Sequence, residues 1–153
     1  MGDFGLDIVA DSAESLIRTL DRLHSERGLD VDHQLLPGLA VRVQREDLDE
    51  LLGNLLDNAY KWAKQRVVVS ALTEGDSVVI MVDDDGPGLP PSMLEAVLQR
   101  GVRADEAAPG SGLGLAIVRD LAELYEGSIM LEASPAGGLR ARLRLPASET
   151  SGV

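Results

Sequence analysis

The feature that most constrains the fold is a long segment with two faces, residues 46–65. Apolar side chains recur along it at steps of three and four, at Leu48, Leu51, Leu52, Leu55, Leu56 and Ala59. This spacing is typical of a helix that buries one side in a core. A second stripe at the same steps carries polar groups, at Asn54, Asn58, Lys61 and Gln65. The segment therefore predicts one anchored helix from which two asparagine amides and an ammonium project together, although the polar stripe alone is also consistent with ordinary surface.

The rest of the chain alternates between helical and extended patterns. Further helices are expected over residues 6–27, 91–98 and 114–125. Strands are expected over residues 29–35, 39–44, 66–72, 77–82, 128–133 and 139–145. Glycine-containing connections at residues 73–76 and 137–138 are typical of hairpins. We therefore expect one α+β domain over residues 1–153, a two-layer α/β sandwich with a mixed, largely antiparallel sheet and helices on one face.

The ends of this domain and one internal segment are expected to be less regular. The core should cover about residues 5–146, and residues 147–153 are expected to fray as a disordered tail. Residues 99–112 contain several glycines and a proline, so we expect a mobile loop there.

The charge balance limits the classes of function. The chain has 26 acidic and 14 basic side chains among 153 residues, a net charge of −12. This sign disfavours a role that depends on general affinity for nucleic-acid phosphates. There are no cysteines for disulfides or thiolate metal sites, and the two histidines, His24 and His33, fall on different predicted elements. No apolar run approaches the ~18 residues that span a bilayer, so we expect a cytoplasmic segment that is not itself membrane-bound.

An acidic, glycine-containing run follows the strand expected over residues 77–82. It reads Asp84-Asp85-Gly86-Pro87-Gly88. A carboxylate at a strand end can accept a hydrogen bond from an exocyclic amine, and the glycines beside it let a flat ring approach the backbone. Taken alone, the spacing Asp-x-Gly-x-Gly favours an ordinary turn.

A second glycine-rich run, Gly110-Ser111-Gly112-Leu113-Gly114-Leu115, opens a predicted helix. Backbone N–H groups and the positive end of the helix dipole suit a phosphate group at such a place. The run lacks the Lys-Ser/Thr of a Walker loop, and no strand directly precedes it as in a dinucleotide fold. A flexible hinge is an equally good interpretation of this run alone.

In combination and in this order, the three features resemble the nucleotide-binding domain of sensor histidine kinases, in the superfamily of gyrase, the heat-shock chaperone ATPases and MutL. Residues 54–62 resemble the N box of that family, residues 84–88 its G1 box and residues 110–114 its G2 box. The resemblance covers about residues 5–146 and implies a Bergerat-type ATP-binding fold. Stretches that are especially similar to PhoQ-type kinases are residues 83–90, 100–105 and 125–127.

The resemblance implies Mg²⁺ and ATP as cofactors and assigns roles on the helix. Asn58 would bind Mg²⁺, whose hard oxygen chemistry suits a carboxamide. Asn54 would face the phosphates, and Lys61 would neutralise their charge. Trp62 would pack against the adenine, with an ordinary core position as the alternative.

The resemblance also assigns roles to the two glycine runs and to the segment between them. Asp84 would accept from the adenine amino group, with Gly86, Gly88 and Leu89 around the ring. The polyphosphate would lie on the second run, along Gly110, Ser111, Gly112, Leu113, Gly114 and Leu115. Ser111 is a second candidate ligand for Mg²⁺. Arg100 and Arg103 would meet phosphates or a partner domain from a lid, with solvated surface as the alternative.

Three positions depart from the family pattern. Leu98 stands where the lid usually has a Phe, Ala108 where PhoQ-type lids carry an Arg, and Ser111 where they carry a Gln. The resemblance therefore leaves one phosphate contact without its usual side chain.

Asn54 also bears on the type of reaction. In the gyrase, chaperone and MutL branch, a Glu at this position activates water, which an amide cannot do. The resemblance thus favours a kinase that passes the γ-phosphate to another nucleophile. Neither His24 nor His33 matches the family's acceptor site, so we expect the acceptor in a separate histidine-bearing dimerisation domain, with a response regulator as further partner and an inner-membrane sensor as the parent protein. An anti-sigma-type serine kinase and a nucleotide-binding module without transfer remain alternatives.

Overall fold

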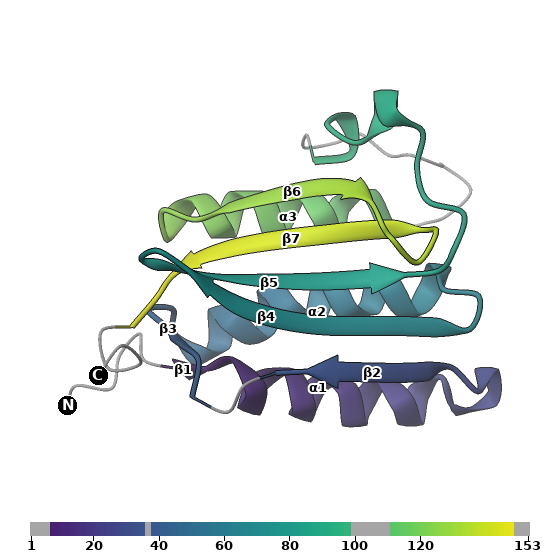
Figure 1. Ribbon diagram of the computed structural model, residues 1–153, viewed down its shortest axis with the longest axis horizontal. Coiled ribbons are helices and arrows are strands. Elements are labelled where there is room, and N and C mark those ends of the chain that lie inside the picture. The colour runs from purple at the N-terminus through teal and green to yellow at the C-terminus, as the bar shows by residue number, and fades with distance from the viewer. Residues whose placement is uncertain (1–6, 36–37, 99–110, 149–153) are drawn as a thin grey trace.

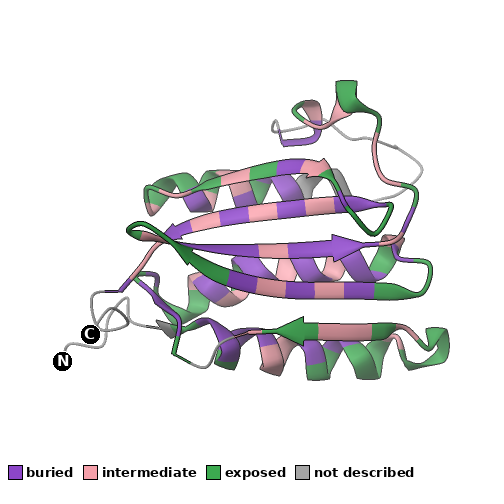
Figure 2. Cartoon of the chain, viewed as in Figure 1, coloured by how far each residue is buried: buried purple, intermediate pink, exposed green. Residues whose placement is uncertain are grey.

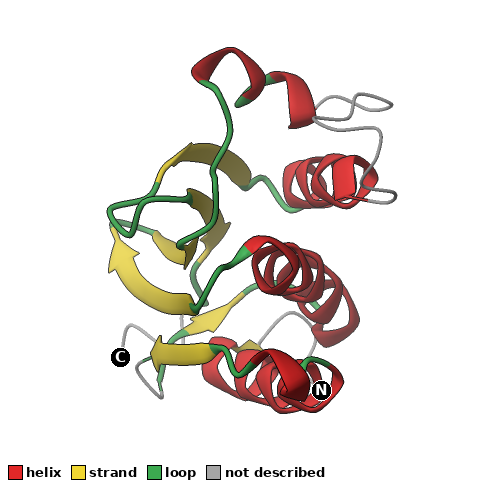
Figure 3. Ribbon diagram, turned by 90° about the vertical axis from the view of Figure 1, so that its right-hand side faces the viewer, coloured by secondary structure: helices red, strands yellow, loops and turns green. Residues whose placement is uncertain are grey.

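The structure is a computed structural model that describes residues 7–35, 38–98 and 111–148. In chain order the elements are β1 (Asp7–Ile8), α1 (Val9–Leu23), η1 (Ser25–Arg27), β2 (Asp30–Gln34), β3 (Ala40–Val41), α2 (Arg45–Trp62), β4 (Arg66–Glu74), β5 (Ser77–Asp84), η2 (Pro91–Met93), η3 (Ala96–Leu98), α3 (Ser111–Leu124), β6 (Ser128–Ala133) and β7 (Leu139–Pro146). A layer of strands lies against α1, α2 and α3 (Figure 1), and the end view separates the two layers clearly (Figure 3). The predicted two-layer α/β sandwich is confirmed.

The main sheet has five strands in the order β2-β4-β5-β7-β6. Only β2 and β4 pair in parallel, and the other neighbours are antiparallel. The predicted hairpin between β4 and β5 is present, with a turn at Gly75 and Asp76. Strand β5 lies at the centre of the sheet and is buried over most of its length, so its end is enclosed by the neighbouring elements (Figure 2).

Helix α2 anchors the helical layer. The predicted apolar stripe is confirmed, because all its members are buried: Leu48, Leu51, Leu52, Leu55, Leu56 and Ala59. The expected end at residue 65 is wrong, since α2 ends at Trp62 and Gln65 is not helical. The Arg27 guanidinium donates to the carbonyl oxygens of Tyr60 and Ala63. These contacts from η1 satisfy carbonyl groups that a continuing helix would have bonded.

Several other element boundaries differ from the sequence prediction. The first helix, expected over 6–27, is preceded by β1, which pairs with β3, and ends at Leu23. A 3₁₀ turn and Gly28, at φ +62°, follow it, because glycine adopts this left-handed conformation without strain. The strand expected over 39–44 shrinks to β3, and the helix expected over 91–98 is two 3₁₀ turns, η2 and η3.

The C-terminal segment is held at its start. The Ala147 N–H donates to the Asp76 carbonyl at 2.9 Å and the Ser148 N–H to the Ala40 carbonyl at 2.9 Å. The prediction that the chain frays from residue 147 is therefore wrong for Ala147 and Ser148. Residues 149–153 and most of the expected loop, residues 99–110, lie outside the described part. Among the described helices, none combines the length and apolarity needed to cross a membrane.

Apart from Tyr60, the buried hydrophobic side chains among the described residues are aliphatic. Tyr60 is the largest fully buried side chain, and its hydroxyl donates to the Asp21 carboxylate at 2.7 Å. Burial, together with this carboxylate, raises the pKa of Tyr60. The hydroxyl therefore stays protonated and joins α2 to α1.

A glycine inside α2 offers a test of this packing. A Cβ added at Gly53 would lie 3.8 Å from Leu16 Cδ2, an ordinary van der Waals contact. Gly53→Ala should raise the free energy of unfolding by about 0.5–1 kcal/mol, because alanine loses less backbone entropy in a helix. Urea denaturation measures this change. At Gly127, by contrast, a Cβ would lie 2.2 Å from the Arg144 carbonyl oxygen, so Gly127→Ala should destabilise, and loss of stability in Gly53→Ala would contradict the packing described.

Candidate functional site

The ends of three elements meet at one end of the domain. The C-terminal end of α2, the end of β5 and the start of α3 all lie on the right in Figure 1, beside the β6–β7 turn. These are the elements that carry the polar stripe, the Asp84 run and the second glycine run. The fold thus brings together motifs that are far apart in the sequence.

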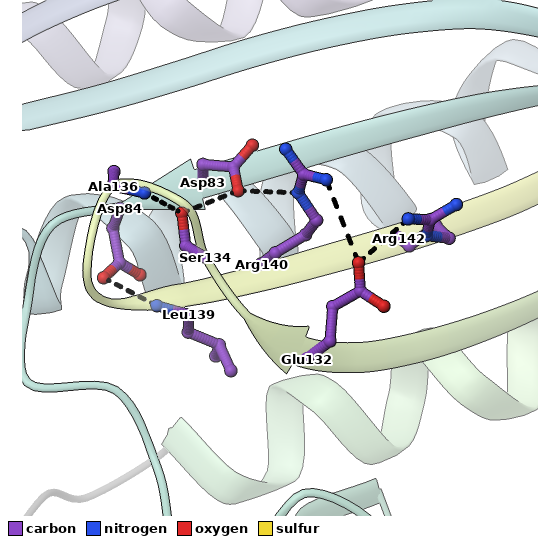
Figure 4. Close-up of polar contacts among 8 residues, drawn as sticks. All are labelled: Asp83, Asp84, Glu132, Ser134, Ala136, Leu139, Arg140 and Arg142. Carbon is purple, nitrogen blue, oxygen red and sulfur yellow. Dashed lines mark hydrogen bonds and ion pairs between the residues drawn. The ribbon is translucent and has the colours of Figure 1, made fainter.

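Asp84 is buried at the end of β5, with 3% of its surface exposed. Its Oδ1 accepts from the N–H groups of Gly86, at 2.8 Å, and Leu139, at 3.3 Å. Its backbone carbonyl accepts from the Gly138 N–H at 3.1 Å. Among the described residues, all hydrogen bonds to this carboxylate fall on Oδ1, including the one from Leu139 that Figure 4 shows. Oδ2 is therefore the oxygen that can serve a ligand.

The electrostatics of Asp84 reflect its enclosure. Burial raises its pKa, and the charges of Asp85 and Asp83 add to this effect. The N–H groups of Gly86 and Leu139 oppose the shift because they stabilise the charged form. The site thus holds an acceptor that is costly to bury without a donor.

The neighbouring aspartates bind other parts of the chain. Asp85 accepts from the N–H groups of Lys64, Gln65 and Arg66, at 2.8–3.2 Å. Burial opposes ionisation of Asp85, but these N–H groups prevail and lower its pKa. Asp85 therefore fixes the connection between α2 and β4. The sequence reasoning missed this role, and the only signal for it was the run of three aspartates.

Glycines allow close approach of backbone segments around Asp84. A Cβ added at Gly86 would lie 2.2 Å from the Trp62 carbonyl oxygen. At Gly138 it would lie 2.2 Å from Asp84 Oδ1, so this glycine belongs to the site although the sequence suggested only a turn. Gly88 has φ +71° and lies next to the Gly138 backbone. Atoms of the protein itself thus occupy the positions that a side chain at Gly86 or Gly138 would need.

The polar stripe of α2 faces this end of the fold. The Asn54 amide donates to the Glu50 carbonyl at 2.9 Å, and its Oδ1 lies close to Gly114, where an added Cβ would be 3.2 Å away. Lys61 forms an exposed ion pair with Asp57 at 3.2 Å. The half-buried Asn58 side chain makes no hydrogen bond with the described residues. Asn54 and the start of α3 are thus adjacent, and the amide of Asn58 is available.

Further candidate residues lie around these groups. Trp62 and Leu89 are half-buried, and Leu115 is buried in the core. Leu98, at the place of the family's Phe, is also buried, with 5% exposed. His24 packs against the Tyr60 ring, with centroids 5.4 Å apart.

The second glycine run differs from expectation in one respect. Helix α3 begins at Ser111, so Ser111, Gly112, Leu113 and Gly114 are helical and do not belong to the loop before it. The first N–H groups of a helix have no partner within it, so this helix start suits an anion. Only the backbone is described for residues 111–113, while Arg100, Arg103, Ala108 and Gly110 lie outside the described residues.

No group of three His, Cys, Asp or Glu side chains within residues 7–35, 38–98 and 111–148 could hold a metal ion. A metal at this end of the fold would therefore depend on ligands from a bound molecule as well as on amide or hydroxyl groups.

Comparison with known proteins identifies the family. The sequence model described as "Histidine kinase-, DNA gyrase B-, and HSP90-like ATPase" matches residues 43–149. The chain belongs to this ATPase family. The chain is 48% identical over 137 residues to the sensor protein kinase CarS of Pseudomonas aeruginosa, covering 90% of this chain and 31% of CarS. It is 38% identical over 132 residues to the virulence sensor histidine kinase PhoQ of Salmonella typhimurium, covering 86% of this chain and 27% of PhoQ.

Solved structures agree with this assignment. The ATP-binding domain of PrrB from Mycobacterium tuberculosis has a TM-score of 0.79 and 30% identity, covering 96% of this chain and 99% of that chain. The expected resemblance to sensor histidine kinase ATP-binding domains is thus confirmed, as is the fold class. The chain spans about a third of the length of the curated relatives it matches.

Neutralising Asp84 tests the cost of holding its carboxylate in the core. Because its pKa is raised by folding, the folded state binds more protons than the unfolded chain between the ordinary Asp pKa of about 4 and the raised value. The free energy of unfolding therefore falls as pH rises through this window. Asp84→Asn keeps an acceptor for Gly86 and Leu139. It should be more stable than the parent at neutral pH, and the gain should vanish below about pH 4 in urea titrations.

Asp85→Asn is the matched control, for which the opposite change in the free energy of unfolding is expected. The pKa of Asp85 is lowered, so its stabilising contribution is present above the ordinary Asp pKa and is lost as pH falls through the folded value. Asp85→Asn should therefore be less stable than the parent at neutral pH. An Asp84→Asn protein that shares this loss would contradict the cost assigned to the buried carboxylate.

Proposed function

We propose that this chain binds Mg-ATP and donates the γ-phosphate to a histidine on a separate dimerisation domain, as the catalytic part of a two-component sensor histidine kinase. The observation that carries the proposal is the buried Asp84 carboxylate, which keeps one oxygen for a ligand at the same end of the fold as the start of α3. The family membership and the similarity to CarS and PhoQ support it.

The adenine would lie at Asp84. Oδ1 is fixed by two backbone N–H groups, so Oδ2 would accept from the 6-amino group of the base. A buried acceptor without a donor costs free energy, and this favours a ligand that supplies one. The half-buried Trp62 and Leu89 would flank the ring, with Gly86 and Gly88 in the adjoining backbone.

The phosphates would lie at the start of α3. The N–H groups of its first turn and the positive end of its dipole favour an anion there, along Gly110, Ser111, Gly112, Leu113, Gly114 and Leu115. Lys61 would turn from Asp57 toward the phosphates, because its exposed ion pair contributes little. Arg100 and Arg103 are proposed as further phosphate contacts.

Asn58 is the proposed protein ligand of the magnesium ion, with Ser111 as a second ligand. The Asn58 amide makes no hydrogen bond with the described residues, and an amide oxygen suits this hard cation. When bound, the ion would neutralise charge on the phosphates. The remaining ligands would be phosphate oxygens and water, as is usual for Mg²⁺ bound with a nucleotide.

Asn54 favours transfer over hydrolysis. Its amide donates to the Glu50 carbonyl and has no basic atom that could take a proton from water. Phosphoryl transfer depends mainly on positioning and charge neutralisation, so the site would hold the γ-phosphate for an external nucleophile. His24 packs on Tyr60 at the end of α1 and His33 lies on the edge strand β2, so neither is proposed as that nucleophile.

The proposed partners follow from this reaction. They are the histidine-bearing dimerisation domain of the parent kinase and a response regulator. Nucleic acid is not proposed as a partner, because the net charge is −12. We place the domain in the cytoplasm and propose an inner-membrane sensor as its parent protein.

Transfer to a histidine can be measured directly. The chain is mixed with labelled ATP, Mg²⁺ and a separately expressed histidine-hairpin domain, and the phosphate on that domain is tested for stability. Acid-labile, base-stable phosphate is expected, and Asn58→Ala should abolish it because the metal loses the ligand that α2 supplies. Acid-stable phosphoserine on a partner would instead support the anti-sigma-type kinase, and binding of Mg-ATP without any transfer would support the regulatory module.

The adenine role of Asp84 predicts a loss of affinity. Asp84→Asn should weaken ATP binding by about 1–3 kcal/mol, or about 5- to 150-fold, the scale of a lost hydrogen bond to a charged group. Calorimetry with a non-hydrolysable ATP analogue measures the change. Asp76→Asn, which removes an exposed carboxylate from the β4–β5 turn, is the charge-matched control and should bind normally. Unchanged affinity in Asp84→Asn would remove the assigned role.

A further inference from the structure

The β6–β7 turn is packed directly against the Asp84 carboxylate. Gly138 donates its N–H to the Asp84 carbonyl, and Leu139 donates its N–H to Oδ1. A Cβ at Gly138 would lie 2.2 Å from Oδ1 and 2.6 Å from the Gly86 nitrogen. The position of this turn therefore decides how many donors Oδ1 receives.

Ser134 holds the turn together from within. Its N–H donates to the Gly138 carbonyl at 2.8 Å, and its carbonyl accepts from the Gly137 N–H at 2.9 Å. Its Oγ accepts from the Ala136 N–H at 3.0 Å and donates to Asp83 Oδ1 at 2.8 Å. With 8% of its surface exposed, the side chain is shielded from water that could replace these partners. The hydroxyl thus joins the turn to β5.

Arg140 makes a second connection to Asp83. Its Nε donates to Asp83 Oδ1 at 2.8 Å, and this bond raises the pKa of the guanidinium. Glu132 lies on the other side of Arg140, at 3.9 Å, and accepts from Arg142 at 2.9 Å (Figure 4). Asp83 is buried, with 4% exposed, so the pair is largely desolvated and its geometry is restricted.

Asp83 and Asp84 are adjacent on β5, so their side chains point to opposite faces of the sheet. Asp83 reaches the turn residue Ser134 and the strand residue Arg140 on the face away from the helices, while Asp84 receives Leu139 on the other face. The Leu139 bond, at 3.3 Å, is the longer of the two on Oδ1. A small outward movement of the turn would break it first.

We propose that Asp83, Ser134 and Arg140 are positioning residues for purine recognition. They hold the β6–β7 turn against the Asp84 carboxylate, so that Oδ1 stays bonded to the backbone and Oδ2 is presented to the 6-amino group of the base. The inference rests on the proposed role of Asp84 in adenine binding and assigns selectivity to residues that do not touch the nucleotide.

The test compares two ligands that differ only at that amino group. Calorimetry of the whole chain with a non-hydrolysable ATP analogue and the matching purine riboside triphosphate analogue, which lacks the amine, gives a selectivity ratio. Ser134→Ala and Asp83→Asn should each weaken binding of the ATP analogue about tenfold, the scale of one charge-assisted hydrogen bond, and leave binding of the purine riboside analogue nearly unchanged. A general loss of structure would weaken both ligands together.

Two further variants serve as controls for this test. Arg144 lies on β7 and on the same sheet face as Arg140, but away from the turn, and it forms an ion pair with Glu74 of β4. Arg144→Gln breaks that pair and should keep the full selectivity ratio of the parent. In an Asp84→Asn background, Ser134→Ala should change the ratio less than twofold, because the effect is transmitted through Asp84.

The outcomes distinguish the adenine role of Asp84 from the positioning role of the three residues around the turn. A parent protein without preference for the amine would overturn both the adenine role of Asp84 and the positioning role. A parent preference that survives unchanged in Ser134→Ala and Asp83→Asn would overturn only the positioning role. Equal weakening of both ligands, or a full effect of Ser134→Ala on the Asp84→Asn background, would also overturn it.

Discussion

A carboxylate buried at the end of the central strand sets the requirements for the surrounding structure. Burying a charged oxygen is costly unless donors surround it, and Asp84 receives two backbone N–H groups on one oxygen. These donors come from segments that are separate in the sequence, the residues after β5 and the start of β7. The end of β5 can therefore hold its charge only if the β6–β7 turn is held close to it, and the contacts of Asp83 meet that condition. Asp85 similarly fixes the connection after α2, so three consecutive side chains fix three parts of the site.

Local spacing predicted the elements whose stability comes from a continuous apolar face. The stripe of α2 and the β4–β5 hairpin needed only periodicity and a glycine turn. The end of α2 could not be predicted in this way, because the carbonyl groups there are satisfied by Arg27, which is more than thirty residues away in the sequence. Helix α3 also begins earlier than its glycines suggest. Glycine is a poor helix former, but Gly114 allows α3 to lie against Asn54, so packing outweighs propensity there.

The parts of the candidate site that lie within sequence motifs could be predicted. The parts that depend on how strands pair could not. The family resemblance singled out Asp84 and the asparagines of α2 as candidates, and their roles stay predictions. The roles of Gly138 and Leu139 depend on the register of β5 with β7, in which Asp83 pairs with Arg140. A single sequence contains no local signal for that register. The acceptor role of Asp85 was hidden for the same reason, since its donors follow α2, about twenty residues earlier.

The donors around Asp84 have one property with a wider consequence. Within the described part of the chain, they are all main-chain N–H groups, which every residue except proline possesses. Replacement of Leu139 by any residue other than proline would therefore leave its N–H donor in place, whereas an insertion or deletion in the β6–β7 turn would move it. Relatives of this domain could thus vary the residue types at Pro135 and Ala136, whereas Ser134, Gly138 and the length of the turn would stay under selection, so that turn length is worth comparing as well as side chains.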